Sequence, residues 1–328
     1  MTPIARSHHP LPLAGGGPVG SLYRLSFPAL GTVCEVQYAT SRAGPPAREF
    51  ERAVVAWVET FEARYSRFRP TSLVSRINAA AGRAWVETDE EMNQLLQVCD
   101  TVHLMTNGVL DPTALPLIQL WNWKSSPPVI PTAGQITAAR RLVGWTKVQR
   151  TAGRILLPEP GMAIDFGGFG KEYAVDVVAQ IALDHGLPNV LVDFGHDIRT
   201  LGSPPGRPAW HIGLEDPDNP GQSSGSIGVS GQGVASSGDY VRSFVVNGVR
   251  YGHIIDPRTG WPVANGCTQV TVIADTCLQA GVLSTTAFVL GLNEGVEFIQ
   301  SFPRAEGMLR SRSSRAQTRG FFNYVATA

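Results

Sequence analysis

Apolar residues recur along the chain at two spacings, which separate predicted strands from predicted helices. Alternation from Leu22 to Tyr38, interrupted at Leu30-Gly31-Thr32, predicts two strands joined by a turn. From Glu49 to Phe68 the apolar positions follow helical spacing, which predicts an amphipathic helix that ends before Pro70. A capping-box pattern from Thr88 to Glu91 predicts another helix, whose inward residues are Met92, Leu95, Leu96, Cys99 and Val102.

The stretch from Met162 to Val192 predicts a compact local unit. Its pattern indicates a short strand over Met162–Asp165, a glycine-rich turn up to Lys171, a helix, and a buried strand over Asn189–Val192. Free amides at a helix N-terminus attract anions, and Lys171 adds a positive charge there. The glycines match neither GxGxxG nor a Walker loop, so an ordinary dinucleotide fold is not supported. A plain strand-to-helix turn with a surface lysine is the alternative interpretation.

Residues 235–263 predict a hairpin that carries polar side chains at its base. Asn247-Gly248 is a strong signal for a tight turn between alternating strands. Pairing of these strands brings Asp239 close to His253, with Asp256 and Arg258 entering the following loop. Such a group of titratable residues on loops indicates an active site, and a polar hairpin end is the alternative.

The remaining pattern predicts further strands and one apolar helix. Strands are expected over Trp210–Pro217 and Gln269–Ile273, and a Gly/Ser-rich loop is expected over Pro220–Gly233. A helix capped by Thr276 is expected to end at Gly291, and the last 25 or so residues are expected to contain a strand pair. Together these elements predict an α+β fold with mixed sheets and packed helices.

Composition narrows the class of protein. Of the 328 residues, 43% are hydrophobic and only 16% charged, and 27 basic residues balance 27 acidic ones. No basic stripe is present, so nucleic acid is not an expected partner. The widely spaced cysteines, Cys34, Cys99, Cys267 and Cys277, form no CxxC pair and are expected to be buried apolar residues.

The N-terminal sequence bears on location. Residues 1–19 are rich in Pro and Gly, lack the apolar run of a signal peptide, and are expected to form a flexible tail. No apolar stretch is long enough for a membrane span. The expected location is therefore cytoplasmic, or periplasmic if translation starts further upstream.

Seven groups of residues, in order, resemble the FAD:protein FMN transferases of the ApbE type. The resemblance runs from about Leu30 to Gly291. The matching groups are Leu30-Gly31-Thr32; Ser66-Arg67-Phe68 with Ser75-Arg76-Ile77-Asn78; Leu110-Asp111-Pro112-Thr113 with Leu120-Trp121; Asp165 to Lys171 with Tyr173-Ala174-Val175-Asp176; Gly195-His196-Asp197-Ile198-Arg199; Ser237-Gly238-Asp239-Tyr240 with His253 to Pro257; and the helix from Thr285 to Gly291.

The resemblance implies an enzyme that moves FMN from FAD onto a Thr or Ser hydroxyl of an acceptor protein and releases AMP, with Mg²⁺ as the metal. It also implies one flavin transferase-like domain over residues 20–328. The roles carried over by resemblance are catalytic for His253, Asp239 and Asp256; cofactor-binding for Leu30, Phe68, Leu110, Asp111, Asp165, Lys171 and Ile255; and metal-binding for Gly168, Ser284 and Thr285.

Three residues depart from the family pattern. Gly281 lies four residues before Thr285, where the family normally carries a metal-binding aspartate on the same helix face. Glycine supplies no side-chain ligand, so a weak or relocated metal site is expected. Glu172 and His196 replace glycines near the expected cofactor, and either is a candidate for a relocated site. The alternative to the transferase is a protein that binds FAD or FMN without cleaving it.

Overall fold

The computed structural model describes residues 7–10, 21–40, 45–239 and 242–326. Within these residues the largest sheet has nine strands, and neighbouring strands run antiparallel. In spatial order the strands are β1 (Ser7–Pro10), β2 (Ser21–Ala29), β3 (Thr32–Thr40), β7 (Val190–Phe194), β8 (Asp197–Leu201), β11 (Gly233–Gly238), β16 (Cys267–Ala274), β17 (Glu306–Ser311) and β18 (Arg315–Gln317).

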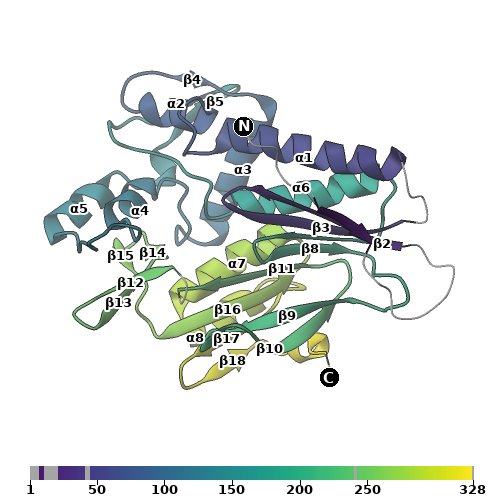
Figure 1. Cartoon of the computed structure of the whole chain (residues 1–328). Coiled ribbons are helices and arrows are strands. Elements are labelled where there is room, and N and C mark those ends of the chain that lie inside the picture. The colour runs from purple at the N-terminus through teal and green to yellow at the C-terminus, as the bar shows by residue number, and fades with distance from the viewer. Residues whose placement is uncertain (1–6, 11–20, 41–44, 240–241, 327–328) are drawn as a thin grey trace.

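Helices and smaller sheets surround this sheet (Figure 1). The helices are α1 (Pro45–Tyr65), α2 (Leu73–Ala79), α3 (Glu90–Met105), α4 (Leu115–Trp121), α5 (Ala133–Arg141), α6 (Gly170–Asp184), α7 (Cys277–Leu290) and α8 (Leu292–Gln300). The smaller sheets pair β9 (Trp210–Asp216) with β10 (Asn219–Val229), β12 (Ser243–Val246) with β13 (Val249–Gly252), β14 (Ile255–Asp256) with β15 (Trp261–Pro262), and β6 (Arg154–Leu156) with both β4 (Val86–Glu87) and β5 (Gln149–Thr151). Two short 3-10 turns cover Trp145–Lys147 and Phe321–Tyr324.

The large sheet is covered differently on its two faces. On β3, Val36 and Tyr38 pack into the core beneath α1 and α6, whereas the next residue, Ala39, belongs to the cluster on the opposite face. This alternation is the two-residue period of a strand. Helices α7 and α8 cover the β16–β17 end on the helical side, and the β9–β10 ribbon covers the other face with Trp210 and Ile212.

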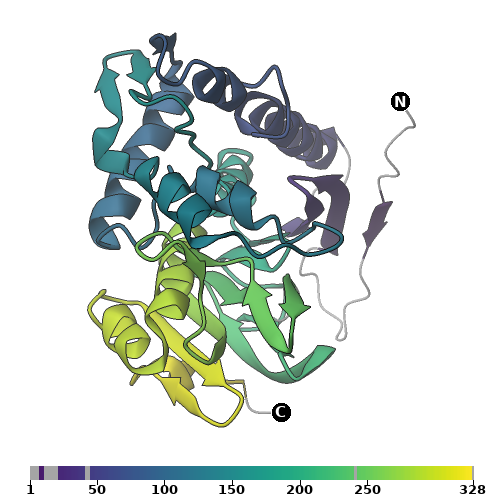
Figure 2. The same cartoon turned by 90° about the vertical axis from the view of Figure 1, so that its left-hand side faces the viewer.

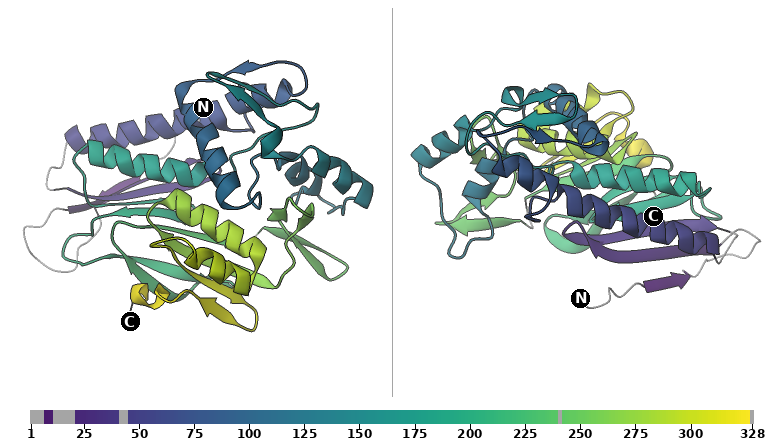
Figure 3. Two further views of the ribbon diagram at one scale, coloured as in Figure 1. Left: turned by 180° about the vertical axis from the view of Figure 1, so that it is seen from behind. Right: turned by 90° about the horizontal axis from the view of Figure 1, so that it is seen from above.

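Views from other sides show how the two halves of the chain meet. Figure 2 shows the helices of the N-terminal half above the C-terminal strands with α7 and α8. Figure 3 shows α1 and α6 side by side along the sheet, and α6 also contacts α7. The helical layer therefore brings segments from both halves together at α6. No helix in the described part of the chain is long and apolar enough to cross a bilayer.

Most predicted elements are confirmed. The Leu30-Gly31 turn joins β2 to β3, and the five residues expected to face inward from α3 are all buried. The helix behind Thr276 spans α7, and the Asn247-Gly248 turn joins β12 to β13 with both turn residues at positive φ. The four cysteines are buried and free. The α+β expectation is thus confirmed.

The predicted strand over Met162–Asp165 is wrong. This segment is extended but pairs with no strand, because the Asn78 side chain takes the place of a partner. The Asn78 amide donates to the Ile164 carbonyl (2.9 Å), and its oxygen accepts from the Ile164 N–H (2.8 Å). The Asp165 N–H donates to the Pro112 carbonyl (2.9 Å). A side chain distant in sequence therefore satisfies the backbone here.

Two other local predictions need correction. The loop expected over Pro220–Gly233 mostly forms β10, which tolerates its Gly and Ser residues through register shifts and buries Ile227 and Val229 against the sheet. The N-cap of α3 is Asp89, whose carboxylate accepts from the Met92 N–H (2.8 Å), and Thr88 lies one residue outside.

The expected N-terminal tail is described only over residues 7–10, which pair with β2 as an edge strand. The rest of that tail, and the hairpin residues Tyr240 and Val241, lie outside the described residues. The boundary between a tail and the domain at residue 20 stays a prediction.

Candidate active site

His253 lies directly after β13, at the base of the predicted hairpin. Its N–H donates to the Arg242 carbonyl (3.0 Å), which extends the strand pairing. Its Nδ1 atom is buried and has no hydrogen-bond partner in the described part of the chain. Burial, together with the nearby charge of Arg242, lowers the pKa of His253 from 6.5 to about 4. The ring is therefore neutral at neutral pH and able to accept a proton.

Asp239 packs against the residue that precedes His253. A Cβ atom on Gly252 would lie 2.8 Å from the Asp239 Cβ, so only glycine allows this approach. Asp239 Oδ1 is buried without a hydrogen-bond partner among the described residues, and the nearest cation is Arg250 at 3.8 Å. Burial raises the pKa of Asp239, and Arg250 opposes the rise. The hairpin thus places two groups with unused acceptor atoms on adjacent backbone.

Asp256 and Ile255 lie just beyond His253 on β14, but Asp256 is fully engaged. Its carboxylate accepts from the Arg258 backbone N–H (2.9 Å) and from the Arg258 guanidinium (2.8–3.2 Å). Its carbonyl accepts from Gly260 (2.7 Å). These bonds hold the Pro257–Gly260 turn, so the geometry gives Asp256 a positioning role. Ile255 is half-buried and pairs with Pro262.

Tryptophans beyond the Leu110–Thr113 loop pack on this hairpin. The Trp121 indole N–H donates to the Gly260 carbonyl (2.8 Å), and its ring stacks on Tyr251 at 5.7 Å between centroids. Trp123 meets the His253 ring edge-on at 6.5 Å. Aromatic packing therefore orients the histidine from the N-terminal half of the chain.

The N-terminus of α6 has the features of an anion site. Phe169, its N-cap residue, makes no side-chain capping bond. The Gly170 N–H donates to the Phe166 carbonyl (2.5 Å), and the next two amides of the first turn, those of Lys171 and Glu172, stay available among the described residues. The Lys171 ammonium lies beside this terminus and pairs with Asp197, the first residue of β8 after the β7–β8 turn. His196 occupies that turn with φ 72° and is exposed, and its N–H donates to Asp193 (2.7 Å).

A chain of contacts links the other cofactor-binding candidates. Asp165 pairs with Arg67 (3.3 Å), whose guanidinium lies 4.3 Å from the Phe68 ring centroid. Burial raises the pKa of Asp165, and the Arg67 charge opposes it. Phe68 itself is 77% exposed, which leaves its ring free for stacking. Leu30 at the β2–β3 turn is half-buried against the same core, and its N–H donates to Glu62 (3.4 Å).

The Asp111 carboxylate holds the Leu110–Thr113 loop in place through hydrogen bonds. It accepts from the Thr113 N–H (2.8 Å) and from the Trp145 N–H (2.9 Å), and it lies 3.5 Å from His103 Nδ1. The next residue, Pro112, accepts the hydrogen bond from Asp165, which joins this loop to the loop before α6. Leu110 is half-buried, and its N–H donates to the Thr106 hydroxyl (3.1 Å). Any effect of Asp111 on a cofactor would therefore also act through this loop.

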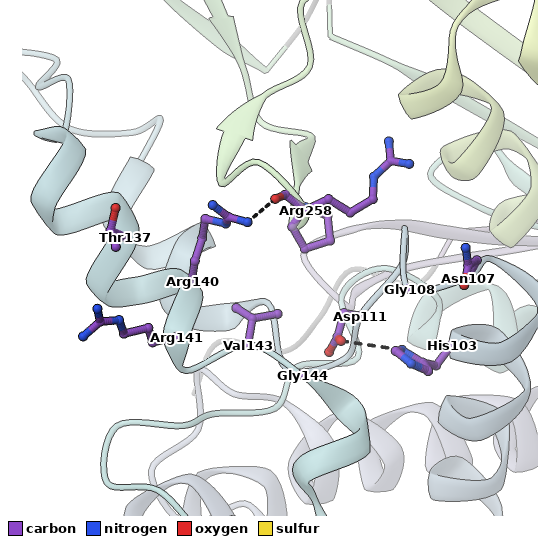
Figure 4. Close-up of a pocket in the computed structure, with 11 residues that line it drawn as sticks. His103, Asn107, Gly108, Asp111, Thr137, Arg140, Arg141, Val143, Gly144 and Arg258 are labelled. Carbon is purple, nitrogen blue, oxygen red and sulfur yellow. Dashed lines mark hydrogen bonds and ion pairs between the residues drawn. The ribbon is translucent and has the colours of Figure 1, made fainter.

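A pocket of about 480 Å³ opens beside Asp111, between α5 and the Pro257-Arg258 turn. Figure 4 shows Asp111 paired with His103 on one side and the Arg140 guanidinium directed at the Arg258 backbone on the other. Arg140, Arg141 and Arg258 give this pocket a positive lining. It includes none of Asp165, Lys171 or His253, so it is a neighbour of the assembled site and not its centre.

Hydroxyl groups gather where α7 meets β11. The Ser237 hydroxyl lies 2.9 Å from the Ser284 hydroxyl and 2.9 Å from the Thr285 hydroxyl. Ser284 also donates to the Gly281 carbonyl (3.1 Å). Gly168 is exposed in the turn before α6, and a Cβ there would meet nothing within 4 Å. Across the described residues, no three His, Cys, Asp or Glu side chains cluster tightly enough to hold a metal ion.

Sequence reasoning identified the motifs but not every residue within them. Arg67 and Ser237 were parts of matched motifs without assigned roles, and Trp123 lay just beyond one. The role of Arg67 could have been predicted, because it is an arginine directly before the aromatic residue Phe68. The contacts of Ser237 and Trp123 join residues far apart in the sequence, so no local pattern indicates them.

Comparison with known proteins gives the class. A family model described as the ApbE family matches residues 30–309. The chain therefore belongs to the ApbE family.

Relatives in sequence and structure agree with this class. A Vibrio cholerae serotype O1 protein named FAD:protein FMN transferase is 29% identical over 287 residues, covering 87% of this chain and 86% of that protein. A Klebsiella pneumoniae protein of the same name is 33% identical over 230 residues, covering 69% and 71%. The crystal structure of the ApbE protein from Thermotoga maritima superposes with a TM-score of 0.84 at 31% identity, covering 93% of this chain and all (100%) of that one. The fold expected from the resemblance is confirmed.

Proposed function

We propose that this chain transfers FMN from FAD to a Thr or Ser hydroxyl of an acceptor protein and releases AMP. The observation that carries the proposal is a half-buried, neutral His253 with a buried, unused Nδ1, held beside Asp239 in a member of the ApbE family. The named relatives carry this activity in their names.

Each bond formed or broken in this reaction, and the proton released, can be accounted for. The acceptor hydroxyl oxygen forms a bond to the phosphorus of the FMN half, the diphosphate P–O bond breaks, and AMP departs with the bonding electrons. His253 takes the hydroxyl proton, since its ring is neutral in the free protein. A bound diphosphate beside the ring would raise the pKa of His253 and strengthen it as a base. Asp239 orients the hairpin end and the attacking group.

Binding of FAD is assigned to the elements around α6. The free amides of α6 and Lys171 attract the diphosphate, and Asp165, Leu30 and Ile255 flank it. The exposed ring of Phe68 stacks on a planar ring of the cofactor, and Leu110 and Asp111 support the loop below. Mg²⁺, held near Gly168, Ser284 and Thr285, would neutralise diphosphate charge.

The test follows both products. The purified protein is incubated with FAD, Mg²⁺ and an acceptor domain that the Vibrio cholerae transferase modifies, with that transferase as positive control. AMP and flavin-labelled acceptor are expected in equal amounts, and neither is expected when the target threonine is replaced by valine. AMP without labelled acceptor would indicate hydrolysis and overturn the proposal. FAD bound but intact would leave a flavin-binding protein.

A further inference from the structure

The Glu172 side chain presents an unusual buried charge. Glu172 is 8% exposed, and its Oε2 atom is buried without a hydrogen-bond partner in the described residues. Lys171, the residue before Glu172, pairs with Asp197, and Arg199 pairs with Asp176 one turn further along α6. A buried carboxylate without a donor is costly unless a proton or a cation neutralises it.

Helices α6 and α7 pack antiparallel, and their contacts fix where Glu172 points. The Asp176 carboxylate accepts from the N–H groups of Cys277 (2.9 Å) and Leu278 (2.8 Å) at the start of α7. One turn back along α6 and one turn forward along α7, a Cβ on Gly281 would lie 2.7 Å from Glu172 Cγ and 2.9 Å from Glu172 Oε1. The Glu172 carboxylate therefore occupies the space that a side chain at position 281 would fill.

Hydroxyl groups follow Gly281 along α7, at Ser284 and Thr285. One further turn along α7 brings Thr285 onto the same helix face as Gly281, because residues four apart share a face. Gly168 lies in the turn that leads into α6, two residues before the helix begins. The Thr285 and Ser284 hydroxyls already gather around Ser237. The α6–α7 contact thus carries one carboxylate from α6 and hydroxyls from the next turn of α7, and the turn before α6 adds backbone carbonyls. These are the oxygen ligands of hard divalent cations, and Mg²⁺ commonly uses only one or two carboxylates together with substrate phosphates.

We infer that Glu172 is the anionic ligand of a divalent cation bound between α6 and α7, with the Thr285 hydroxyl and the Gly168 carbonyl as neutral ligands. The charge comes from α6, since Gly281 on α7 supplies none. The purpose of the cation beside a diphosphate rests on the proposed function, but its binding does not. Glu172 and Gly281 form a matched pair: a small residue on one helix makes room for a carboxylate from the other.

The test measures metal binding directly. Mn²⁺ alone is titrated into FAD-free protein, and free Mn²⁺ is followed by electron paramagnetic resonance. Glu172→Gln keeps the shape of the side chain and removes its charge, so the dissociation constant is expected to rise at least about tenfold. Glu297→Gln, an exposed position on α8, is the matched control and is expected to leave binding unchanged. Urea unfolding of each variant confirms that it is folded.

A charge-exchange variant gives a second, independent readout. Glu172→Gly combined with Gly281→Asp moves the carboxylate from α6 to α7 and is expected to restore Mn²⁺ affinity to within a few-fold of wild type. Gly281→Asp alone would press two carboxylates together and is expected to lower stability without tighter binding.

The outcomes separate this inference from the proposed function. Unchanged Mn²⁺ affinity in Glu172→Gln would show that Glu172 has a structural role only, and would overturn the inference even if FMN transfer occurs. No Mn²⁺ binding by the wild type up to a few millimolar would also overturn it. Mn²⁺ binding that depends on Glu172, in a protein that transfers no FMN, would support the inference and refute the function.

Discussion

Replacing His253 by asparagine tests the neutral state of this half-buried ring through the pH dependence of stability. The unfolded chain binds a proton at His253 near pH 6.5, whereas the folded chain binds it only near pH 4. Between these values the unfolded state holds more protons, so the free energy of unfolding falls as the pH falls. The pKa difference corresponds to about 3 kcal/mol of the free energy of unfolding, because a shift of one pKa unit is worth about 1.4 kcal/mol.

The assay is urea unfolding of wild type and His253→Asn from about pH 7.5 to about pH 4.5. Other groups titrate equally in both proteins, so the difference between them isolates His253. Relative to wild type, the variant is expected to gain about 2 to 3 kcal/mol of stability across this range. His211→Asn, at an exposed position on β9, is the control and is expected to show no such gain. Parallel pH curves for wild type and His253→Asn would refute the neutral state of the ring.

The same variant tests catalysis. Loss of a general base is expected to lower kcat/KM by roughly 10² to 10⁴. Since kcat/KM reports the free enzyme, its acid limb in the wild type is expected well below pH 6.5, near the pKa of about 4. An acid limb at pH 6.5 would place the essential base elsewhere.

Three further substitutions separate binding from stability. Phe68→Ala is expected to change the free energy of unfolding by less than about 0.5 kcal/mol, because the ring is 77% exposed. The same variant is expected to weaken FAD binding, measured by flavin fluorescence. Unchanged binding would exclude stacking on Phe68. Asn78→Ala removes both hydrogen bonds to Ile164 and is expected to destabilise the fold by about 2 to 3 kcal/mol in urea, with Asn323→Ala, an exposed position, as the neutral control. His196→Gly relieves a left-handed backbone at φ 72° and is expected to raise the free energy of unfolding by about 1 kcal/mol, whereas a loss would mean that the imidazole makes a compensating contact.

Sequence patterns predicted those parts of the fold that depend on near neighbours along the chain. The inward face of α3 is confirmed because helical spacing alone decides which side chains share a face. The β12–β13 hairpin is confirmed because Asn247-Gly248 tolerates the positive φ angles of a tight turn. The order of motifs indicated the family, and with it the fold.

Prediction failed where a distant partner decided the local structure. Met162–Asp165 has a strand-like pattern, yet the Asn78 side chain satisfies its backbone in place of a neighbouring strand. Residues 219–229 have a loop-like composition, yet pairing with β9 and burial of Ile227 stabilise a strand. Composition describes only the local preference, and burial against another element outweighs it.

For the site, the sequence by itself determined the chemistry available: a histidine and an aspartate joined by a hairpin, a lysine at a helix N-terminus, and a glycine in α7 without a carboxylate. Only the tertiary structure decided how these groups meet. It partly buried His253 and so lowered its pKa, and it placed Glu172 in the space above Gly281. The physical reason is that burial and helix–helix register depend on packing between residues more than 100 positions apart, which neither periodicity nor a local motif encodes.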